Sequence, residues 1–256
     1  MKKNQNKQVS AIILAAGKGA RMNNSKKVNK TMMLLGDKPM VAFVVETLKK
    51  LNLGQIILVV GYAKESIITY FQDKVDYAVQ RRCLGTANAV KVGLKQLSKK
   101  NDYVLVTNGD DSAFYSKVIF AKLIKACLQP GVVFSLLTLR KRKPEGLGRI
   151  IRDSSGQLIG IIEEKNATRK QKEIKEINTG TYCFRRKFLE KYLPLVRKNK
   201  LTGEYYLTDT VSLAIRNKLQ VATLKLKDET CWHGVNTKDQ LKKAQRKMQQ
   251  KINKDK

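Results

Sequence analysis

The sequence is poor in the residues that build metal centres and disulfide frameworks. It contains a single histidine, His233, and four cysteines that lie far apart with no C-x-x-C pair. This spacing argues against both the common zinc motifs and a disulfide scaffold. We therefore expect four reduced thiols, as in cytoplasmic proteins.

Acidic residues are also scarce. Only 21 Asp and Glu residues oppose 52 Lys and Arg residues, which gives a formal net charge of +31. Such an excess attracts polyanions, whether a nucleoside triphosphate, RNA or an acidic membrane surface, and charge alone does not choose among them. The lysines are spread along the whole chain without interleaved aromatic residues, so we favour a solvated basic surface over a dedicated nucleic-acid partner.

The sequence has no long apolar run and no flexible linker. The apolar stretch 11–16 is too short to span a membrane, and Lys2 and Lys3 only imitate a signal peptide. We expect a cytoplasmic protein without a transmembrane segment. Because no proline-rich or glycine-serine linker divides the chain, we expect one domain over 9–237, with a basic tail at 1–8 and a basic helix or tail at 238–256.

Strand-like and helix-like apolar patterns alternate through the first half of the chain. Five apolar segments have the length and composition of buried strands, and helical spacing occurs in the segments between them. The expected strands cover 9–14, 55–60, 75–80, 103–107 and 132–138. The alternation predicts an α/β fold with a doubly wound, mostly parallel sheet.

The pattern changes near residue 147. A turn signal at 153–156 predicts a hairpin, and it is followed by an expected strand at 177–184. Helices near 187–198 and 205–216 and a strand at 219–226 complete the prediction. We expect this half to form a smaller mixed lobe on the same sheet.

The first strand leads directly into the sequence Leu-Ala-Ala-Gly-Lys-Gly-Ala-Arg-Met at 14–22. Glycine lets backbone N–H groups approach phosphate oxygens, and Lys18 and Arg21 add positive charge. The spacing matches neither the dinucleotide fingerprint nor the ATPase phosphate loop. By itself, the motif is equally compatible with a plain turn.

Three loops are expected at one edge of the sheet, because ligands of open parallel sheets bind at the carboxyl ends of strands. In the loop after the expected strand 75–80, Gln80 can pair with a base edge and Gly85 lets the backbone approach a planar ring. Thr86 suits a helix cap as well as a ligand contact. In the loop after the expected strand 103–107, Asp110 and Asp111 suit a hard cation such as Mg²⁺. The alternative is that they form a turn or cap a helix.

Nine short motifs occur in a fixed order: 14–22, 29–30 with 36–40, 80 with 84–87, 109–110, 146–150, 163–165, 177–180, 203–209 and 234–236. Over about residues 8 to 240 the chain resembles the nucleotide-sugar pyrophosphorylases, or sugar-1-phosphate nucleotidyltransferases. It is most similar to the uridylyltransferase domain of bacterial bifunctional N-acetylglucosamine-1-phosphate uridylyltransferases. The resemblance implies a Rossmann-like, glycosyltransferase-A-like sheet with a smaller sugar-binding lobe.

The resemblance also implies roles for individual residues. It places Arg21 and Lys30 on the triphosphate as catalytic residues, and Asp110 and Asn236 on a Mg²⁺ ion. The nucleotide-binding positions are Leu14, Ala15, Ala16, Gly17, Gln80, Gly85 and Thr86. The amino-sugar positions are Gly148, Glu163, Asn178, Tyr206 and Thr208. Arg149 and Lys165 are interpreted equally well as surface cations or as ligands.

The implied activity is Mg²⁺-dependent transfer of a uridylyl group from UTP to a sugar 1-phosphate, with N-acetylglucosamine 1-phosphate as the expected acceptor. A sugar 1-phosphate is already an oxyanion, so no general base is needed, and we expect His233 to serve in packing. Two alternatives stay open: use of CTP, dTTP, GTP or another phosphorylated acceptor, and an inactive regulator that senses nucleotides or binds RNA.

The chain departs from the family pattern at three places. Asn108 replaces the usual aromatic residue before Gly109-Asp110, and Asp111-Ser112 stands where a proline is common. The hexapeptide-repeat acetyltransferase half of the bifunctional enzymes is not found, so acetyl transfer is not expected. The segment from Lys238 onward is interpreted as a solvated surface helix, with a basic amphipathic segment for a membrane or partner as the alternative.

Overall fold

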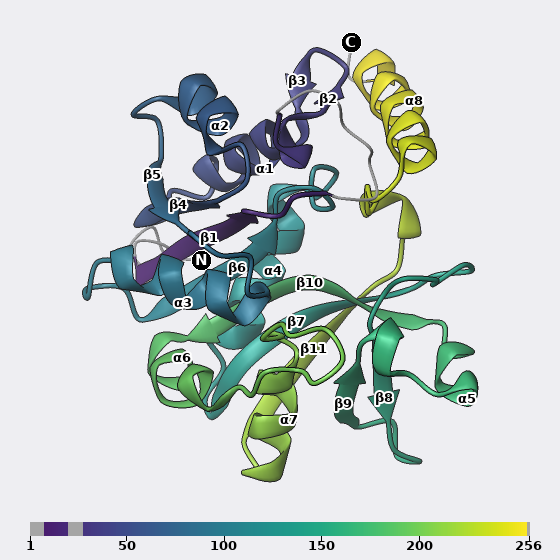
Figure 1. Cartoon of the computed structure of the whole chain (residues 1–256). Helices are drawn as coiled ribbons and strands as arrows, with labels where there is room; N and C mark the ends of the chain where they lie inside the picture. Colours follow the sequence, from purple (N-terminus) through teal and green to yellow (C-terminus); the bar gives the residue numbers. More distant parts are fainter. Residues whose placement is uncertain (1–7, 20–27, 255–256) are drawn as a thin grey trace.

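A path of seven strands forms the centre of the computed structural model, which describes residues 8–19 and 28–254. The strand order is β11-β7-β10-β6-β1-β4-β5 (Figure 1). Their bounds are β11 (Gln220–Leu226), β7 (Val132–Arg140), β10 (Glu176–Arg185), β6 (Tyr103–Asn108), β1 (Val9–Ala15), β4 (Gln55–Val60) and β5 (Asp76–Val79).

Most neighbouring strands on this path are parallel. Strand β10 runs antiparallel to both of its neighbours, β6 and β7. The buried apolar strand β1 pairs in parallel with β4 and β6, with Ala15 opposite Val60 and Leu14 opposite Asn108. The carboxyl ends of these strands therefore meet at one edge, as expected from the sequence.

Helices cover both faces of the sheet (Figure 1). One apolar core lies under α1 (Met40–Lys49), α2 (Lys64–Phe71) and α4 (Lys117–Cys127). A second core on the other face lies under α3 (Thr86–Gln96), α6 (Arg186–Tyr192) and α7 (Asp209–Arg216). The prediction of a doubly wound, mostly parallel α/β sheet is confirmed.

The smaller lobe branches from β10. Strands β8 (Arg149–Arg152) and β9 (Leu158–Ile162) form the expected hairpin, followed by the short helix α5 (Arg169–Lys172). Arg149 is 1% exposed, and its Nη2 lies 2.6 Å from Oε2 of Glu164. The interpretation of Arg149 as a surface cation is therefore wrong, because its guanidinium forms a buried ion pair within this lobe.

Two helices differ from the prediction. The helix expected over 205–216 begins only at Asp209, because Tyr205 donates its N–H to the carbonyl of Leu84 at 2.8 Å. The helix expected over 187–198 ends at Tyr192 and continues as one 3-10 turn that contains Pro194. Both segments have apolar residues at helical spacing. A tertiary hydrogen bond shortens the helix in the first segment, and proline ends it in the second.

The C-terminal helix α8 (Lys238–Lys254) packs on the body of the protein beside β2 (Leu34–Leu35) and β3 (Lys38–Pro39). Its apolar side joins a third core with Leu35, Met40 and Phe114; the contributing helix residues are Leu241, Ala244, Met248 and Ile252. The apolar side of α8 is thus covered by this chain, which contradicts a free amphipathic segment.

None of the helices in the described ranges combines the length and apolarity needed to cross a membrane.

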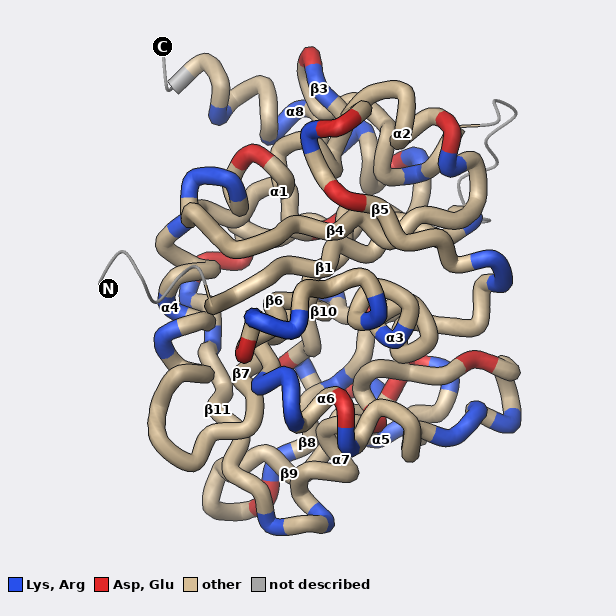
Figure 2. Tube along the Cα trace, turned by 90° about the vertical axis from the view of Figure 1, so that its left-hand side faces the viewer, with Lys and Arg blue, Asp and Glu red and all other residues tan. Residues whose placement is uncertain are grey.

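Basic residues occur on most elements of the fold. In Figure 2, Lys and Arg segments appear on helices and loops all over the visible side, with Asp and Glu between them. This distribution agrees with a general basic surface.

Candidate active site

A cavity of about 510 Å³ opens at the carboxyl ends of β1, β5 and β6. We call it the strand-end cavity. Ten of the predicted catalytic, nucleotide-binding and metal-binding residues line it: Leu14, Ala15, Ala16, Gly17, Lys30, Gln80, Gly85, Thr86, Asp110 and Asn236. Arg21, the other predicted catalytic residue, lies outside the described residues. Loops distant in sequence therefore share one hollow.

The phosphate-loop side of this cavity depends on a close approach between two backbone segments. Gly19 has a φ of +60°, and a Cβ on it would lie 2.9 Å from Cβ of Lys30. Only glycine meets both conditions without strain. The second glycine of the loop therefore lets Lys30 pack against the turn.

Asn29 fixes the position of Lys30, and in the sequence it stands out only as a member of the 29–30 motif. Its side chain is fully buried, and its Nδ2 donates to the carbonyls of Ala15 and Tyr62, both at 2.8 Å. Its Oδ1 accepts from the backbone N–H of Thr31 at 2.9 Å. Asn29 thus connects the end of β1, the loop after β4 and the start of the lysine turn.

We expect Asn29→Ala to lower the free energy of unfolding by about 3 kcal/mol, because it leaves several buried backbone groups without partners. For a chain of this size the midpoint of thermal unfolding should fall by roughly 6–12 °C. Asn217→Ala is the matched control, since the Asn217 side chain donates only to the carbonyl of Leu213 at an exposed helix end. Equal unfolding temperatures for the two variants would contradict the role assigned to Asn29.

Lys30, Asp110 and Asn236 meet at one end of the strand-end cavity. The Lys30 ammonium forms an ion pair with Oδ2 of Asp110 and donates to Oδ1 of Asn236 at 3.1 Å. The Lys30 and Asp110 side chains are 13% and 18% exposed. Asp110 and Asn236 therefore direct oxygen atoms toward the same cation.

This pair of oxygens fits a metal that completes its shell with other ligands. A carboxylate and an amide oxygen are hard donors of the kind that Mg²⁺ prefers. In the described parts of the chain, no three or more His, Cys, Asp or Glu side chains gather as a metal cage. The Lys30 ammonium already occupies the position between the two oxygens, so a cation is chemically compatible with this point.

The loop after β5 builds the opposite end of the cavity. Gln80 is 5% exposed, and its Nε2 donates to the carbonyl of Gly85 at 3.1 Å and to Oδ1 of Asn88 at 2.9 Å. Gly85 has a φ of +97°, and a Cβ there would lie 2.5 Å from the carbonyl oxygen of Tyr205. The glycine is therefore needed where the smaller lobe crosses this loop.

Thr86 does not cap the helix that follows it. It is the first residue of α3, and Gly85 is the cap residue. The Thr86 hydroxyl instead accepts the backbone N–H of Leu207 at 2.9 Å. This contact joins the cavity loop to the segment that carries Tyr206 and Thr208.

The predicted sugar residues lie in the smaller lobe. Oε1 of Glu163 accepts from the Thr208 hydroxyl at 2.9 Å, and burial raises the pKa of the Glu163 carboxyl. The backbone N–H of Asn178 donates to the carbonyl of Gly148 at 2.9 Å. A Cβ on Gly148 would lie 3.5 Å from Oε2 of Glu163, so these residues form one cluster.

Tyr206 is engaged elsewhere. Its hydroxyl donates to Oγ1 of Thr202 at 2.7 Å, within its own loop. Lys165, two residues beyond Glu163, lines the strand-end cavity together with Glu204. The smaller lobe therefore borders the cavity directly, and Glu204 is a wall residue that the sequence did not single out.

The unusual loop after β6 is built around a buried carboxyl group. Nδ2 of Asn108 donates to Oδ2 of Asp111 at 2.9 Å, and burial, together with the charge of Asp110, raises the pKa of Asp111 well above its usual value. The loop also packs Phe114 edge-on against the His233 ring, with the ring centres 4.6 Å apart. Asp111 does not line the strand-end cavity. The departure from the family pattern thus creates an internal contact rather than a second cavity carboxylate.

Comparison with known proteins agrees with this architecture. The bifunctional protein GlmU of Carboxydothermus hydrogenoformans is 39% identical over 233 residues, which cover 91% of this chain and 51% of that protein. GlmU of Francisella philomiragia is 38% identical over 245 residues, or 95% of this chain and 52% of the relative. The chain spans about half the length of the curated relatives it matches.

A solved structure shares the fold at low sequence identity. It is described as a glucose-1-phosphate thymidylyltransferase from Bacillus anthracis in complex with sucrose, and it superimposes with a TM-score of 0.76 at 20% identity. The match covers 93% of this chain and 94% of that chain. The family model described as nucleotidyl transferase matches residues 10–251. With this sheet, this cavity and a match over nearly its whole length, the chain belongs to the nucleotidyl transferase family.

Proposed function

We propose that the chain transfers a uridylyl group from UTP to a sugar 1-phosphate, giving a UDP-sugar and pyrophosphate. N-acetylglucosamine 1-phosphate is the acceptor we favour. The observation that carries the proposal is the contact of the Lys30 ammonium with both Asp110 and Asn236 at the edge of the strand-end cavity. The likeness to proteins named GlmU supports the choice of nucleotide and sugar.

The proposed reaction is an in-line displacement at the α-phosphorus of UTP. An oxygen of the sugar phosphate forms the new bond to phosphorus, and the bond to the β-phosphate oxygen breaks, so pyrophosphate departs. No proton must be removed from the attacking oxygen, because it is already ionised at neutral pH. The protein's task is therefore alignment and stabilisation of negative charge.

Lys30 is the described residue best placed for that task. Its ammonium lies near the end of β1, where the Ala16-Gly17 backbone borders the same cavity. We assign Lys30 to the triphosphate, and Asp110 and Asn236 to a Mg²⁺ ion, for which the Lys30 ammonium would move from between their oxygens onto the phosphates. When bound, Mg²⁺ would neutralise phosphate charge and help hold the triphosphate in line. Arg21 stays a predicted triphosphate ligand.

We assign the far end of the cavity to the base. The NH₂ group of Gln80 is engaged by the carbonyl of Gly85 and Oδ1 of Asn88, so we assign its Oε1 to an N–H on the polar edge of uracil. Gly85 shapes this end of the cavity by letting the Tyr205 backbone approach closely. The Thr86 hydroxyl accepts the backbone N–H of Leu207, so we assign Thr86 to holding the loop in place.

We assign the cluster around Glu163 to the sugar. A buried carboxylate accepts hydrogen bonds from hydroxyl groups strongly, and Glu163 lies beside Gly148 and Thr208. The backbone N–H of Asn178 donates to the carbonyl of Gly148. We keep Tyr206 as a predicted sugar contact, although its hydroxyl would have to leave Thr202 to reach a ligand.

We expect Glu163→Gln to raise the KM for the sugar 1-phosphate by about 10- to 100-fold, the cost of losing a charged hydrogen-bond partner. The KM for UTP should change less than about threefold, because the cavity that we assign to the nucleotide keeps its wall. Glu173→Gln, an exposed change near α5, is the control. Steady-state kinetics with each substrate varied in turn measures the effect, and an equal rise in both KM values would argue against a sugar contact.

The activity itself is tested with a matrix of nucleotides and acceptors. Pyrophosphate release is measured with UTP, CTP, dTTP and GTP, each against a panel of sugar 1-phosphates, with and without Mg²⁺. We expect release with UTP and N-acetylglucosamine 1-phosphate in the presence of Mg²⁺. Activity with CTP, dTTP or GTP but not UTP would overturn the nucleotide assignment, and no release from any pair would overturn catalysis.

A further inference from the structure

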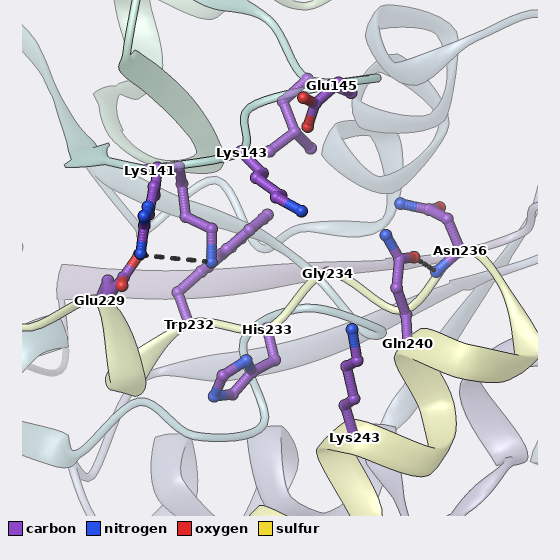
Figure 3. Close-up of a pocket in the computed structure, with 12 residues that line it drawn as sticks. Lys141, Lys143, Glu145, Glu229, Trp232, His233, Gly234, Asn236, Gln240 and Lys243 are labelled. Atoms are coloured by element: carbon purple, nitrogen blue, oxygen red, sulfur yellow. Dashed lines mark hydrogen bonds and ion pairs between the residues drawn. The ribbon is translucent and has the colours of Figure 1, made fainter.

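A second cavity, of about 530 Å³ (Figure 3), shares a wall residue with the strand-end cavity. We call it the basic pocket. Its walls are the loop after β7, the segment before α8 and the first turns of α8, with Lys141, Lys143, Trp232, Asn236, Gln240 and Lys243 among the lining residues. Asn236 borders both cavities. The nucleotide and sugar assignments above make no use of the basic pocket.

The amide side chains of this pocket offer donors rather than acceptors. Oε1 of Gln240 already accepts the backbone N–H groups of Asn236 and Thr237, at 2.7 and 3.1 Å. Oδ1 of Asn236 already accepts from the Lys30 ammonium. The NH₂ groups of Gln240 and Asn236 are therefore the ends left to meet a ligand, and each can donate two hydrogen bonds.

Two ammonium groups face the same space from opposite walls. Figure 3 shows Lys143 reaching in from the loop after β7 and Lys243 reaching in from α8. Within the described residues, neither ammonium forms an ion pair with a carboxylate. Of the two acidic wall residues, Glu229 lies 3.9 Å from Lys141, and Figure 3 places the Glu145 carboxylate on the side away from Lys243.

Further basic side chains act on two groups of the pocket wall. The pKa of His233 is lowered to about 4, chiefly by burial and also by the charges of Lys247 and Lys141, against a backbone hydrogen bond of Thr230 and the charge of Asp228. Burial and the charge of Lys247 also lower the pKa of Lys141, against the charge of Glu229. At neutral pH, His233 is therefore uncharged.

We propose that the basic pocket is a second oligophosphate site, which binds pyrophosphate or the phosphate tail of a nucleotide outside the strand-end cavity. A ligand rich in acceptor oxygens and carrying at least two negative charges matches a wall of ammonium and amide donors. Asn236 borders both cavities and accepts from the Lys30 ammonium, so it links the basic pocket to the Lys30–Asp110 pair. The binding itself does not depend on the proposed function, since it needs neither UTP nor a sugar.

The sequence supplies its own reporter for this pocket. Trp232 is the single tryptophan of the chain, and it lies in the wall with the Lys141 ammonium 5.3 Å from the centre of its ring. An anion that draws Lys141 toward itself changes the charge over the indole and hence its fluorescence. Trp232 lines the basic pocket and does not line the strand-end cavity, so its emission reports on the basic pocket.

The test is a fluorescence titration of the whole chain with inorganic pyrophosphate, in EDTA and at constant ionic strength. We expect a saturable change for the unaltered protein and at least about tenfold weaker binding for the double variant Lys143→Gln, Lys243→Gln, which loses two charged donors. The control double variant Lys187→Gln, Lys191→Gln removes the same charge from α6, which Figure 1 shows well away from α8, and should bind normally. Thermal unfolding and the ligand-free emission spectrum verify that each variant is folded.

Further arms separate the possible origins of a signal. UDP titrated in place of pyrophosphate tells whether a nucleotide tail or free pyrophosphate binds more tightly, and either preference supports the site. An equal response to sulfate at the same ionic strength would overturn the proposal, because it would mean charge screening alone. A signal that Lys30→Gln abolishes while the Lys143, Lys243 double variant retains it would place the anion in the strand-end cavity and would also overturn it.

Discussion

Replacing Asp110 with asparagine is expected to lower Mg²⁺-dependent turnover by about 10³-fold while leaving the protein folded. The substitution keeps the size of the side chain and removes the negative charge that faces the Lys30 ammonium. A metal held by Asp110 and Asn236 would lose its charged protein ligand, so the affinity for Mg²⁺ should fall together with kcat. Pyrophosphate release measured over a range of Mg²⁺ concentrations detects both effects.

Asp111→Asn provides a control one residue away. Asp111 is directed to Asn108 within the loop and does not line the strand-end cavity, and an asparagine there can still present an oxygen to Nδ2 of Asn108. We expect its turnover to stay within about threefold of the unaltered protein. If Asp110→Asn retained similar activity, Asp110 would have to be removed from the proposed metal site.

Replacing Lys30 with glutamine should lower kcat/KM for UTP by about 10²-fold, because the cation that we assign to the developing phosphate charge is lost. The same change leaves Asp110 without its ion-pair partner, and Asn236 loses the donor to its Oδ1. We therefore expect part of the loss in kcat and part in the KM for UTP, with little change in the KM for the sugar 1-phosphate. Initial rates at varied UTP and at varied sugar 1-phosphate separate these terms.

Lys165→Gln tests whether any cation of the cavity has the same effect. Lys165 lines the same cavity but is exposed, so its charge is screened by water. We expect a loss of less than about fivefold for this variant. A Lys165→Gln loss as large as that of Lys30→Gln would mean that general positive potential, rather than the position of Lys30, supports the reaction.

The parts of the fold that the sequence predicts well are those with a strong local pattern. Strand β4 covers the expected residues 55–60, because six consecutive residues of strand-forming character lie between clear breaks. The same holds for the alternation of strands and helices on which the doubly wound prediction depends. Parallel strands buried on both faces leave an unmistakable apolar run in the sequence.

The errors occur where distant parts of the chain interact. Residues 205–208 have helical spacing, but their backbone hydrogen-bonds to the loop at 84–86, which no local pattern reveals. For Arg149 the sequence leaves a surface cation and a ligand equally open, and neither interpretation includes its ion pair with Glu164. The sequence favours a solvated surface helix from Lys238 onward, whereas the third core covers the apolar side of α8.

The sequence by itself determined the strand and helix order and the chemical types available at the strand ends: glycine-bearing loops, a lysine, an aspartate and amides. These follow from short-range effects, namely apolar periodicity and the backbone freedom of glycine. Only the tertiary structure decided that Lys30 meets Asn236 across 206 positions of chain, that Asp111 turns inward, and that donors from the loop after β7 and from α8 enclose a second basic pocket. Such contacts depend on how the sheet and its helices pack in three dimensions. The spacing of residues along the chain does not determine which distant residues then lie close together.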